Sequence, residues 1–217
     1  FDSWLEQHFQ PTWSSIEQDR VPEWYKDAKF GIYMHWTPAC VPGKNSHRYA
    51  KRMYRDLKDY HTKHYGHPSE FGYKDFIPMM TLKNWDPDQM AKLFKNSGLR
   101  FAGITSEHHN GFAMWHSELT QWNSAIMGPR RDVTAELARS VRKQRMRFIL
   151  SQHRVSIATP WTQEGWYQRG KGFDTDNPKY WGLYFPPRQG KRSEEWLMDW
   201  KERLVEKVNK YRPSLMW

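Results

Sequence analysis

Residues 85–110 read WDPDQMAKLFKNSGLRFAGITSEHHN, in which a helix pattern runs directly into a strand pattern. Asp86 can cap a helix, Pro87 suits its first turn, and Gly98 can end it. The apolar run over residues 99–106 then predicts a buried strand. Polar residues follow that strand: Glu107, His108, His109 and Asn110. A helix that leads into a buried strand is typical of α/β proteins.

The same alternation extends over the rest of the chain. Apolar runs at residues 30–36, 146–151 and 214–217 predict three further strands. Helical periodicity begins at Asp132 and again at Ser193, where Trp196, Trp200, Leu204, Val208 and Tyr211 form one stripe that ends before Pro213. The order β-α-β-α-β-α-β predicts four parallel strands joined by three crossover helices.

Parallel strands of this kind occur in barrels and in open doubly wound sheets. A doubly wound sheet usually carries a glycine-rich phosphate loop after its first strand, but Thr-Pro-Ala-Cys follows Trp36. We therefore predict an α/β fold, the first four strands of a (β/α)8 TIM-like barrel. Because half a barrel leaves two unpaired strand edges, we expect partner strands later in the native chain or in another subunit.

Composition limits the class of protein. The single cysteine, Cys40, leaves the redox compartment undecided, and we find no apolar run of the ~20 residues that a membrane span needs. Because Phe1 is not a methionine, we expect the native chain to begin upstream, which favours a secreted, periplasmic or lysosomal location over a cytoplasmic one.

The net charge of +10 could suit nucleic acid, an anionic surface or an acidic glycan. However, many cationic residues alternate with acidic ones at helical spacing, as in residues 201–207, which is typical of a solvated helix face. We therefore expect no nucleic-acid or membrane partner. The 13 tryptophans favour sugar binding, because flat indole faces suit sugar rings, although tryptophan is also a core residue.

Two long segments interrupt the alternation of strands and helices. Residues 37–84 follow the first strand, and residues 152–190 follow the third. Loops of this length in a compact domain are usually functional. Both follow the carboxyl end of a strand, which in a barrel is the face that carries the active site.

Polar side chains also gather where the predicted strands end. His35 and Trp36 end the first strand, and the third ends in Gln152, His153 and Arg154. Imidazoles at one mouth could bind sugar hydroxyls or a metal, and any one histidine could simply be a packed residue. His108 and His109 would point to opposite faces of an extended strand, which argues against a metal pair unless the chain turns there. We expect no metal and no cofactor, and keep a metal-dependent TIM-barrel hydrolase as an alternative.

Several ordered motifs resemble family 29 of the glycoside hydrolases, the α-L-fucosidases. KFGIYMHW at residues 29–36, with Val41-Pro42 after it, is similar to that family's opening strand. HHNGF at residues 108–112 and GPRRD at residues 128–132 resemble its His-His-Asp-Gly-Phe and Gly-Pro-Lys-Arg-Asp blocks. The resemblance spans nearly the whole chain, which we interpret as the N-terminal half (1–217) of a catalytic barrel domain.

The resemblance implies a retaining hydrolase that releases terminal α-L-fucose. Its two catalytic carboxyl groups would lie ~5–5.5 Å apart. YRPSLMW at residues 211–217 is similar to the stretch before the family's aspartate nucleophile. The resemblance therefore places the nucleophile just after Trp217 and the acid/base later, so we expect no catalytic residue within the chain and no turnover by it alone. It implies these sugar-binding residues: His35, Trp36, His108, His109, His153 and Trp217.

The sequence departs from the family pattern at four places. His47-Arg48 stands where relatives carry Glu-Trp, and Asn110, Glu107 and Thr37 stand for aspartate, lysine and glycine. The loss of a carboxylate and a stacking surface could move substrate preference, for example to a sulfated fucoside, where Arg48 would fit. It also supports a second hypothesis, a non-catalytic relative that binds fucose or another glycan.

Overall fold

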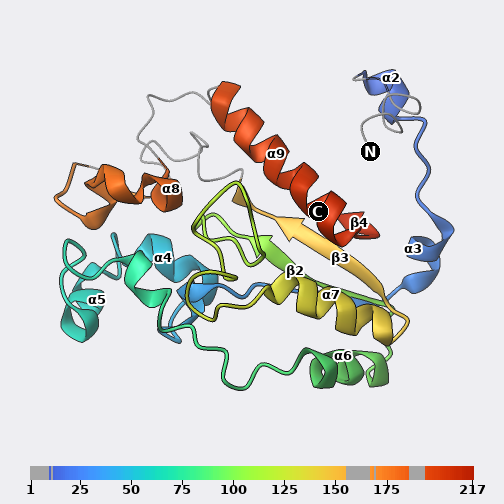
Figure 1. Ribbon diagram of the computed structural model, residues 1–217, viewed down its shortest axis with the longest axis horizontal. Helices are drawn as coiled ribbons and strands as arrows, with labels where there is room; N and C mark the ends of the chain where they lie inside the picture. The colour runs from blue at the N-terminus through green and yellow to red at the C-terminus, as the bar shows by residue number, and fades with distance from the viewer. Residues whose placement is uncertain (1–9, 11, 155–166, 169, 186–193) are drawn as a thin grey trace.

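The fold is that of a computed structural model, which describes residues 10, 12–154, 167–168, 170–185 and 194–217. Its four strands form one parallel sheet in the order β1-β2-β3-β4 (Figure 1). They are β1 (Gly31–Met34), β2 (Phe101–Glu107), β3 (Arg147–Gln152) and β4 (Leu215–Met216). Each lies within or within one residue of a predicted apolar run, so the four predicted strands are confirmed.

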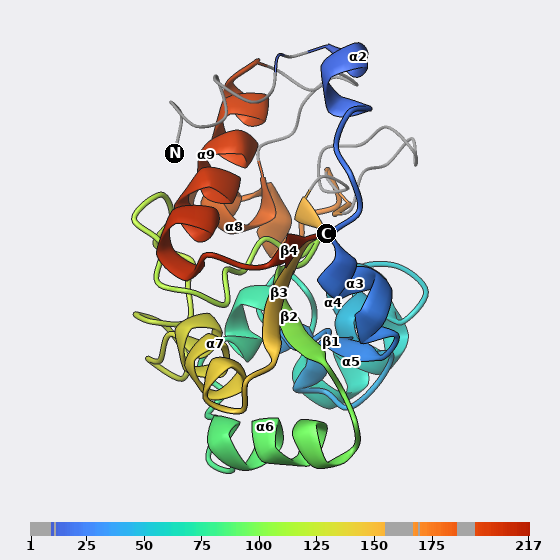
Figure 2. The same ribbon diagram turned by 90° about the vertical axis from the view of Figure 1, so that its right-hand side faces the viewer.

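Three helices make the crossovers between consecutive strands: α6 (Pro87–Asn96), α7 (Val133–Lys143) and α9 (Glu194–Tyr211). Helix α7 packs on β2 and β3, and it contacts α6 on one side and α9 on the other. Figure 2 shows α7 and α9 on the same side of the strands. A doubly wound sheet would reverse its strand order and place helices on both faces. Sequential strands with one helical layer therefore form part of a (β/α) barrel.

The helix boundaries follow the predicted signals. The Asp86 carboxylate accepts a hydrogen bond from the Gln89 amide at 2.9 Å, and Asp132 caps α7 in the same way through the Ala135 amide at 2.8 Å. Gly98 ends the first crossover at φ +86°, a left-handed conformation that favours glycine. The predicted cap at Ser193 lies outside the described residues.

The long segments after β1 and β3 contain short helices and pack on each other. The other helices of the described residues are α2 (Trp13–Ile16), α3 (Glu23–Ala28), α4 (Tyr49–Arg52), α5 (Lys58–Tyr65) and α8 (Trp181–Tyr184), with 3-10 turns at Pro38–Cys40, Ser46–Arg48, Tyr73–Phe76, Asp174–Asp176 and Pro178–Tyr180. The buried Tyr54 hydroxyl donates to Asp174 at 2.8 Å, which joins the two segments. Tyr54 and Tyr73 are fully enclosed in the core, so the first segment is packed structure.

Within the described residues, β1 and β4 each pair with a strand on one side. On β1, Ile32 is 38% exposed and Tyr33 is 42% exposed, which is unusual for side chains of a barrel strand. Among the described helices, none has the length and apolar character needed to cross a membrane.

Candidate functional site

Five histidines meet at the carboxyl edge of the sheet. His35 follows β1, His108 and His109 follow β2, and His153 follows β3, while His47 comes from the Ser46–Arg48 turn in the first long segment. The His35 Nε2 and His153 Nδ1 atoms are 3.5 Å apart. The His47 ring centre lies 4.7 Å from that of His35 and 4.8 Å from that of His108. We call these five residues the histidine cluster.

The neighbouring His108 and His109 both face this cluster. Strand β2 ends at Glu107 with an irregular register against β3, and the chain then turns, so that the Gly111 amide donates to the His108 carbonyl at 3.1 Å. Gly111 itself has φ +82°. The two rings are 4.4 Å apart, and that of His109 is 5.5 Å from His153. The two side chains do not alternate as they would on an extended strand, because the chain turns here, which is the exception that the sequence left open.

Burial keeps the cluster uncharged at neutral pH. It lowers the pKa of His35 to about 4, with help from His153 and His47, and lowers that of His109 to about 4, where His153 adds to the effect. The pKa of His108 lies well below its usual value because the ring is buried beside His109. Burial also lowers the pKa of His47 and His153. A neutral imidazole has one N–H donor and one nitrogen acceptor, a combination that suits hydroxyl groups.

Acid is expected to destabilise the fold through this cluster. Below pH ~6.5 the histidines of the unfolded chain bind protons, whereas those of the cluster stay neutral until the pH approaches their lowered pKa values, about 4 for His35 and His109. The unfolded state therefore gains protons first, and stability falls as pH drops from 6.5 to 4. Melting temperatures between pH 7.5 and 4.5 should fall less steeply for His109→Gln. The exposed His64→Gln is the control, and an unchanged slope for His109→Gln would contradict this account.

Two of the residues that depart from the family pattern are bonded to each other. The Asn110 amide donates to the Thr37 hydroxyl at 2.9 Å, and both side chains are fully buried. This bond links the segment after β1 to the segment after β2. Thr37 is two residues after His35, and Asn110 directly follows His109. Thr37 and Asn110, two of the departures that the resemblance implies, therefore contact each other in the structure.

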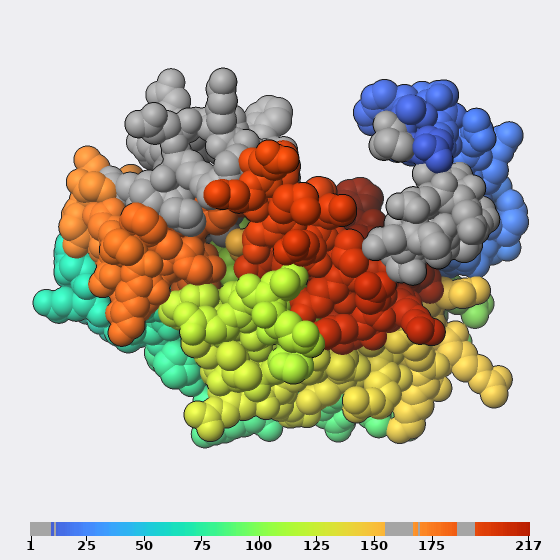
Figure 3. Space-filling view, turned by 45° about the horizontal axis from the view of Figure 1, so that its top comes forward, coloured from blue at the N-terminus to red at the C-terminus, as the bar shows by residue number. Residues whose placement is uncertain are grey.

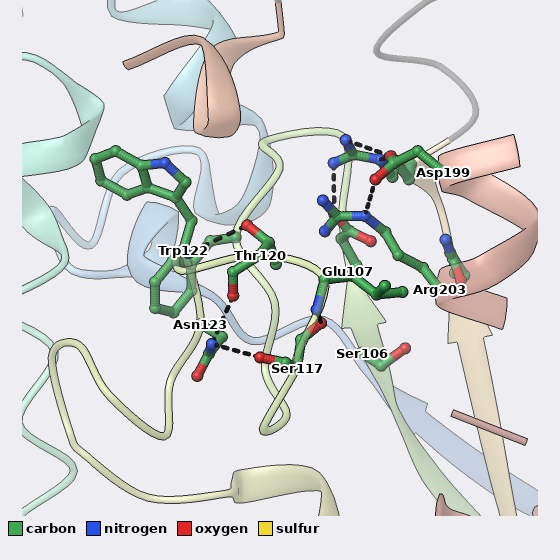
Figure 4. Close-up of polar contacts among 12 residues, drawn as sticks. Ser106, Glu107, Ser117, Thr120, Trp122, Asn123, Asp199 and Arg203 are labelled. Carbon is green, nitrogen blue, oxygen red and sulfur yellow. Dashed lines mark hydrogen bonds and ion pairs between the residues drawn. The ribbon is translucent and has the colours of Figure 1, made fainter. Parts of the chain in front are cut away.

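A third departure, Glu107, belongs to a buried ionic cluster with Arg154, Asp199, Arg203 and Lys207. Its carboxylate accepts from Arg154 at 2.7 Å and lies 3.4 Å from Arg203, and both arginines pair with Asp199 of α9. Figure 4 shows Arg203 and Asp199 reaching from α9 toward Glu107 at the end of β2. Glu107 directly precedes His108, and Arg154 directly follows His153. The buried ionic cluster therefore fixes the backbone next to both histidines.

The prediction of a solvated face for residues 201–207 is wrong for two of its cations. Arg203 is 3% exposed and Lys207 is fully buried. Lys207 donates to the Gln152 side chain and lies 3.3 Å from the Ser106 hydroxyl. Burial lowers its pKa to about 7, while Glu107 opposes that effect. The sequence showed these cations as part of an alternating charge pattern, and nothing local in it indicated partners on β2 and β3.

The two tryptophans predicted for the site follow the first and the last strand, β1 and β4. The Trp36 ring packs 4.8 Å from that of Trp85 and is half-buried. Trp217 is 72% exposed at the end of β4, where its carbonyl accepts from the Gln152 amide at 2.9 Å. Their roles in sugar binding stay predictions. His47, by contrast, was not among the predicted binding residues, although its departure from the family pattern had marked it.

A separate cavity of about 410 Å³ opens on the outer side of the buried ionic cluster. Its wall includes Trp122, Trp181, Trp196 and Arg203. In Figure 3, the loop after β2 (yellow-green) lies between α9 (red) and α8 (orange), the elements that surround this cavity. The histidines instead lie at the ends of the strands, where a barrel carries its active site. Three of them, His35, His108 and His153, also have the spacing of possible metal ligands.

Comparisons with known proteins place this geometry in a family. A family profile described as Alpha-L-fucosidase matches residues 2–217. Mouse tissue alpha-L-fucosidase is 31% identical over 216 residues, and human plasma alpha-L-fucosidase is 36% identical over 145 residues. These matches cover 96% and 63% of the chain, respectively, and 42% and 30% of the relatives.

A solved structure agrees with these matches. The Thermotoga maritima alpha-fucosidase in complex with a mechanism-based inhibitor superposes with a TM-score of 0.74 at 29% identity, over 96% of this chain and 49% of that one. The chain thus spans less than half the length of the relatives it matches. The match over nearly all of the sequence, together with the shared barrel, shows that the chain belongs to the alpha-L-fucosidase family.

Proposed function

We propose that the protein releases terminal α-L-fucose from fucosylated glycans or simpler fucosides, with the histidine cluster as the part of the site that holds the sugar. The observation that carries this proposal is the convergence of His35, His108 and His109 from the first two strand ends in a chain of this family. The names of the relatives support the activity. Neutral imidazoles fixed by buried neighbours would bind several hydroxyls at once, which orients the anomeric carbon.

We infer a retaining mechanism with two carboxyl groups contributed by residues after Trp217. One carboxylate attacks the anomeric carbon while the other group, as an acid, protonates the departing oxygen, so that a covalent glycosyl-enzyme forms and the aglycone leaves. Water then attacks the same carbon, the second group accepts its proton, and the first carboxylate departs. Trp217 directly follows β4, and the catalytic residues of barrels lie at the carboxyl ends of the strands.

In this proposal residues 1–217 are the N-terminal half of a catalytic barrel domain. The single-sided pairing of β1 and β4 supports this, because the rest of the barrel, or another subunit, would cover their edges. We also propose a secreted, periplasmic or lysosomal location, which is supported by the name of a human relative, plasma alpha-L-fucosidase.

The first long segment supports a more specific proposal, a sulfated fucoside. Arg48 is exposed beside His47, so its positive charge is available to an anionic group near the sugar. Arg48→Ala should lower kcat/KM for a sulfated aryl fucoside by up to about fivefold, the scale of an exposed charge pair, and leave the unsulfated substrate unchanged. Equal effects on both substrates would contradict a role in sulfate recognition.

The activity is tested with the native protein, freed of metals by chelation, and 4-nitrophenyl α-L-fucoside. We expect release of nitrophenol, with α-L-fucose as the first anomer seen by NMR, because two displacements restore the original configuration. First appearance of the β anomer would overturn the retaining mechanism. Binding of L-fucose without release of nitrophenol would favour the glycan-binding relative, and the absence of both would overturn the proposed function.

A further inference from the structure

We propose that the histidine cluster is also a binding site for a divalent transition-metal ion, with His35, His108 and His153 as its ligands. Each residue comes from the end of a different strand, so the three approach one point from separate elements. One ring nitrogen of each lies within 4.8 Å of the other two. Among the described residues, this is the group of side chains with the spacing of a metal site.

The distances suit a small ion. Two nitrogens that each lie ~2.0–2.1 Å from a tetrahedral zinc are about 3.3–3.4 Å apart. His35 Nε2 and His153 Nδ1 already face each other at 3.5 Å, which is long for a hydrogen bond and close to the separation of two ligands. The remaining separations are at most 4.8 Å, so the nitrogens must approach one another by up to about 1.4 Å when they bind the ion.

The chemical state of the side chains is also suitable. A metal binds the neutral form of an imidazole, and these three rings lie buried or half-buried beside one another at the strand ends. A donor set of imidazoles favours zinc, copper or nickel over magnesium or calcium, which prefer oxygen ligands. The three proposed ligands are all imidazoles, and the neighbouring Glu107 pairs with Arg154 and Arg203 in the buried ionic cluster.

His47 borders this group without belonging to it. Its ring centre lies 4.7 Å from that of His35 and 4.8 Å from that of His108, but the nitrogens within 4.8 Å of one another are those of His35, His108 and His153. The resemblance to the family implies a glutamate at this position, where this chain has an imidazole. The ion would then occupy the place that the proposed function gives to sugar hydroxyls, and metal and sugar would compete. Metal binding itself does not rest on the proposed function.

The test is a calorimetric titration of the chelator-treated native protein at pH 7.5 with Zn²⁺ and, separately, Mg²⁺. We expect one equivalent of Zn²⁺ to bind and no Mg²⁺. His153→Ala and His35→Ala should each weaken Zn²⁺ binding by more than about tenfold, since even the loss of an outer-shell partner of a metal ligand costs 10–100-fold. The exposed His64→Ala is the matched control and should bind Zn²⁺ as the native protein does.

Circular dichroism checks that each variant is folded, and Co²⁺ absorption of the native protein gives a second readout that does not depend on the variants. Tetrahedral imidazole coordination should give visible absorption bands that one equivalent of Zn²⁺ removes. Zn²⁺ binding that is equal in His153→Ala and the native protein, or the absence of these bands, would overturn the proposal. Because no fucoside is present, this failure is distinct from a failure of the proposed activity.

Discussion

Replacing Glu107 by glutamine is expected to lower the free energy of unfolding by about 3–5 kcal/mol, the usual cost of removing one partner from a buried ion pair. The Glu107 side chain is fully buried and lies within 2.7 Å of Arg154 and 3.4 Å of Arg203. Its loss would leave Arg154 and Arg203 with Asp199 as their ion-pair partner, and Lys207 with Glu206 as a nearby carboxylate. Urea unfolding of the native protein and the variant at pH 7 measures the difference.

The matched control for Glu107→Gln is Glu118→Gln. Glu118 pairs with Lys210 at 3.2 Å, but its side chain is 77% exposed, so the same chemical change should cost less than about 1 kcal/mol. The double variant Glu107→Gln/Lys207→Met should recover part of the loss, because it also removes a buried cation. Equal costs for the two single variants would show that the buried ionic cluster does not support the strand ends.

The second large effect is expected at His108, the most deeply buried ring of the cluster. His108→Ala should reduce kcat/KM on an aryl α-L-fucoside by on the order of 10²-fold or more, the scale for losing one preorganised hydrogen-bond donor in an active site. It is 2% exposed and contacts His35, His47, His109 and His153 through their rings.

Because His108 is buried, His108→Ala leaves a cavity, so the comparison also needs His108→Gln. Glutamine fills part of that space and keeps one hydrogen-bond donor group and one acceptor. Both variants should unfold at pH 7 within a few degrees of each other, and the glutamine variant should retain more activity. The exposed His64→Ala should keep full activity. Full activity in a folded His108→Ala protein would remove this residue from the site.

The fold could be predicted from the sequence because its signals are local. Asp86, Pro87 and Gly98 mark the ends of one helix by their own backbone chemistry, and the structure places helix α6 between them. The apolar runs predicted all four strands, and β2 and β3, which are buried on both faces, have the continuous apolar stretch that such strands need. Parallel pairing then follows from the crossover helices.

The site could be predicted only in part, because its remaining features depend on contacts between distant segments. Arg203 and Lys207 occur in an alternating charge pattern that normally faces water, and their burial depends on Glu107 and Gln152, about a hundred and about fifty residues earlier in the chain, respectively. To predict the turn that directs the side chains of both His108 and His109 into the cluster, one would need to know that β2 ends at Glu107. Gly111 was the one local signal of that turn.

The most direct test of the central claim, that the histidine cluster holds the sugar, is the binding of L-fucose to the chelator-treated native protein, measured by calorimetry alongside its enantiomer D-fucose. We predict that L-fucose binds, that D-fucose does not, and that the folded His108→Ala variant loses most of the affinity for L-fucose while His64→Ala keeps it. Equal binding of the two enantiomers, or unchanged L-fucose binding by His108→Ala, would contradict the account.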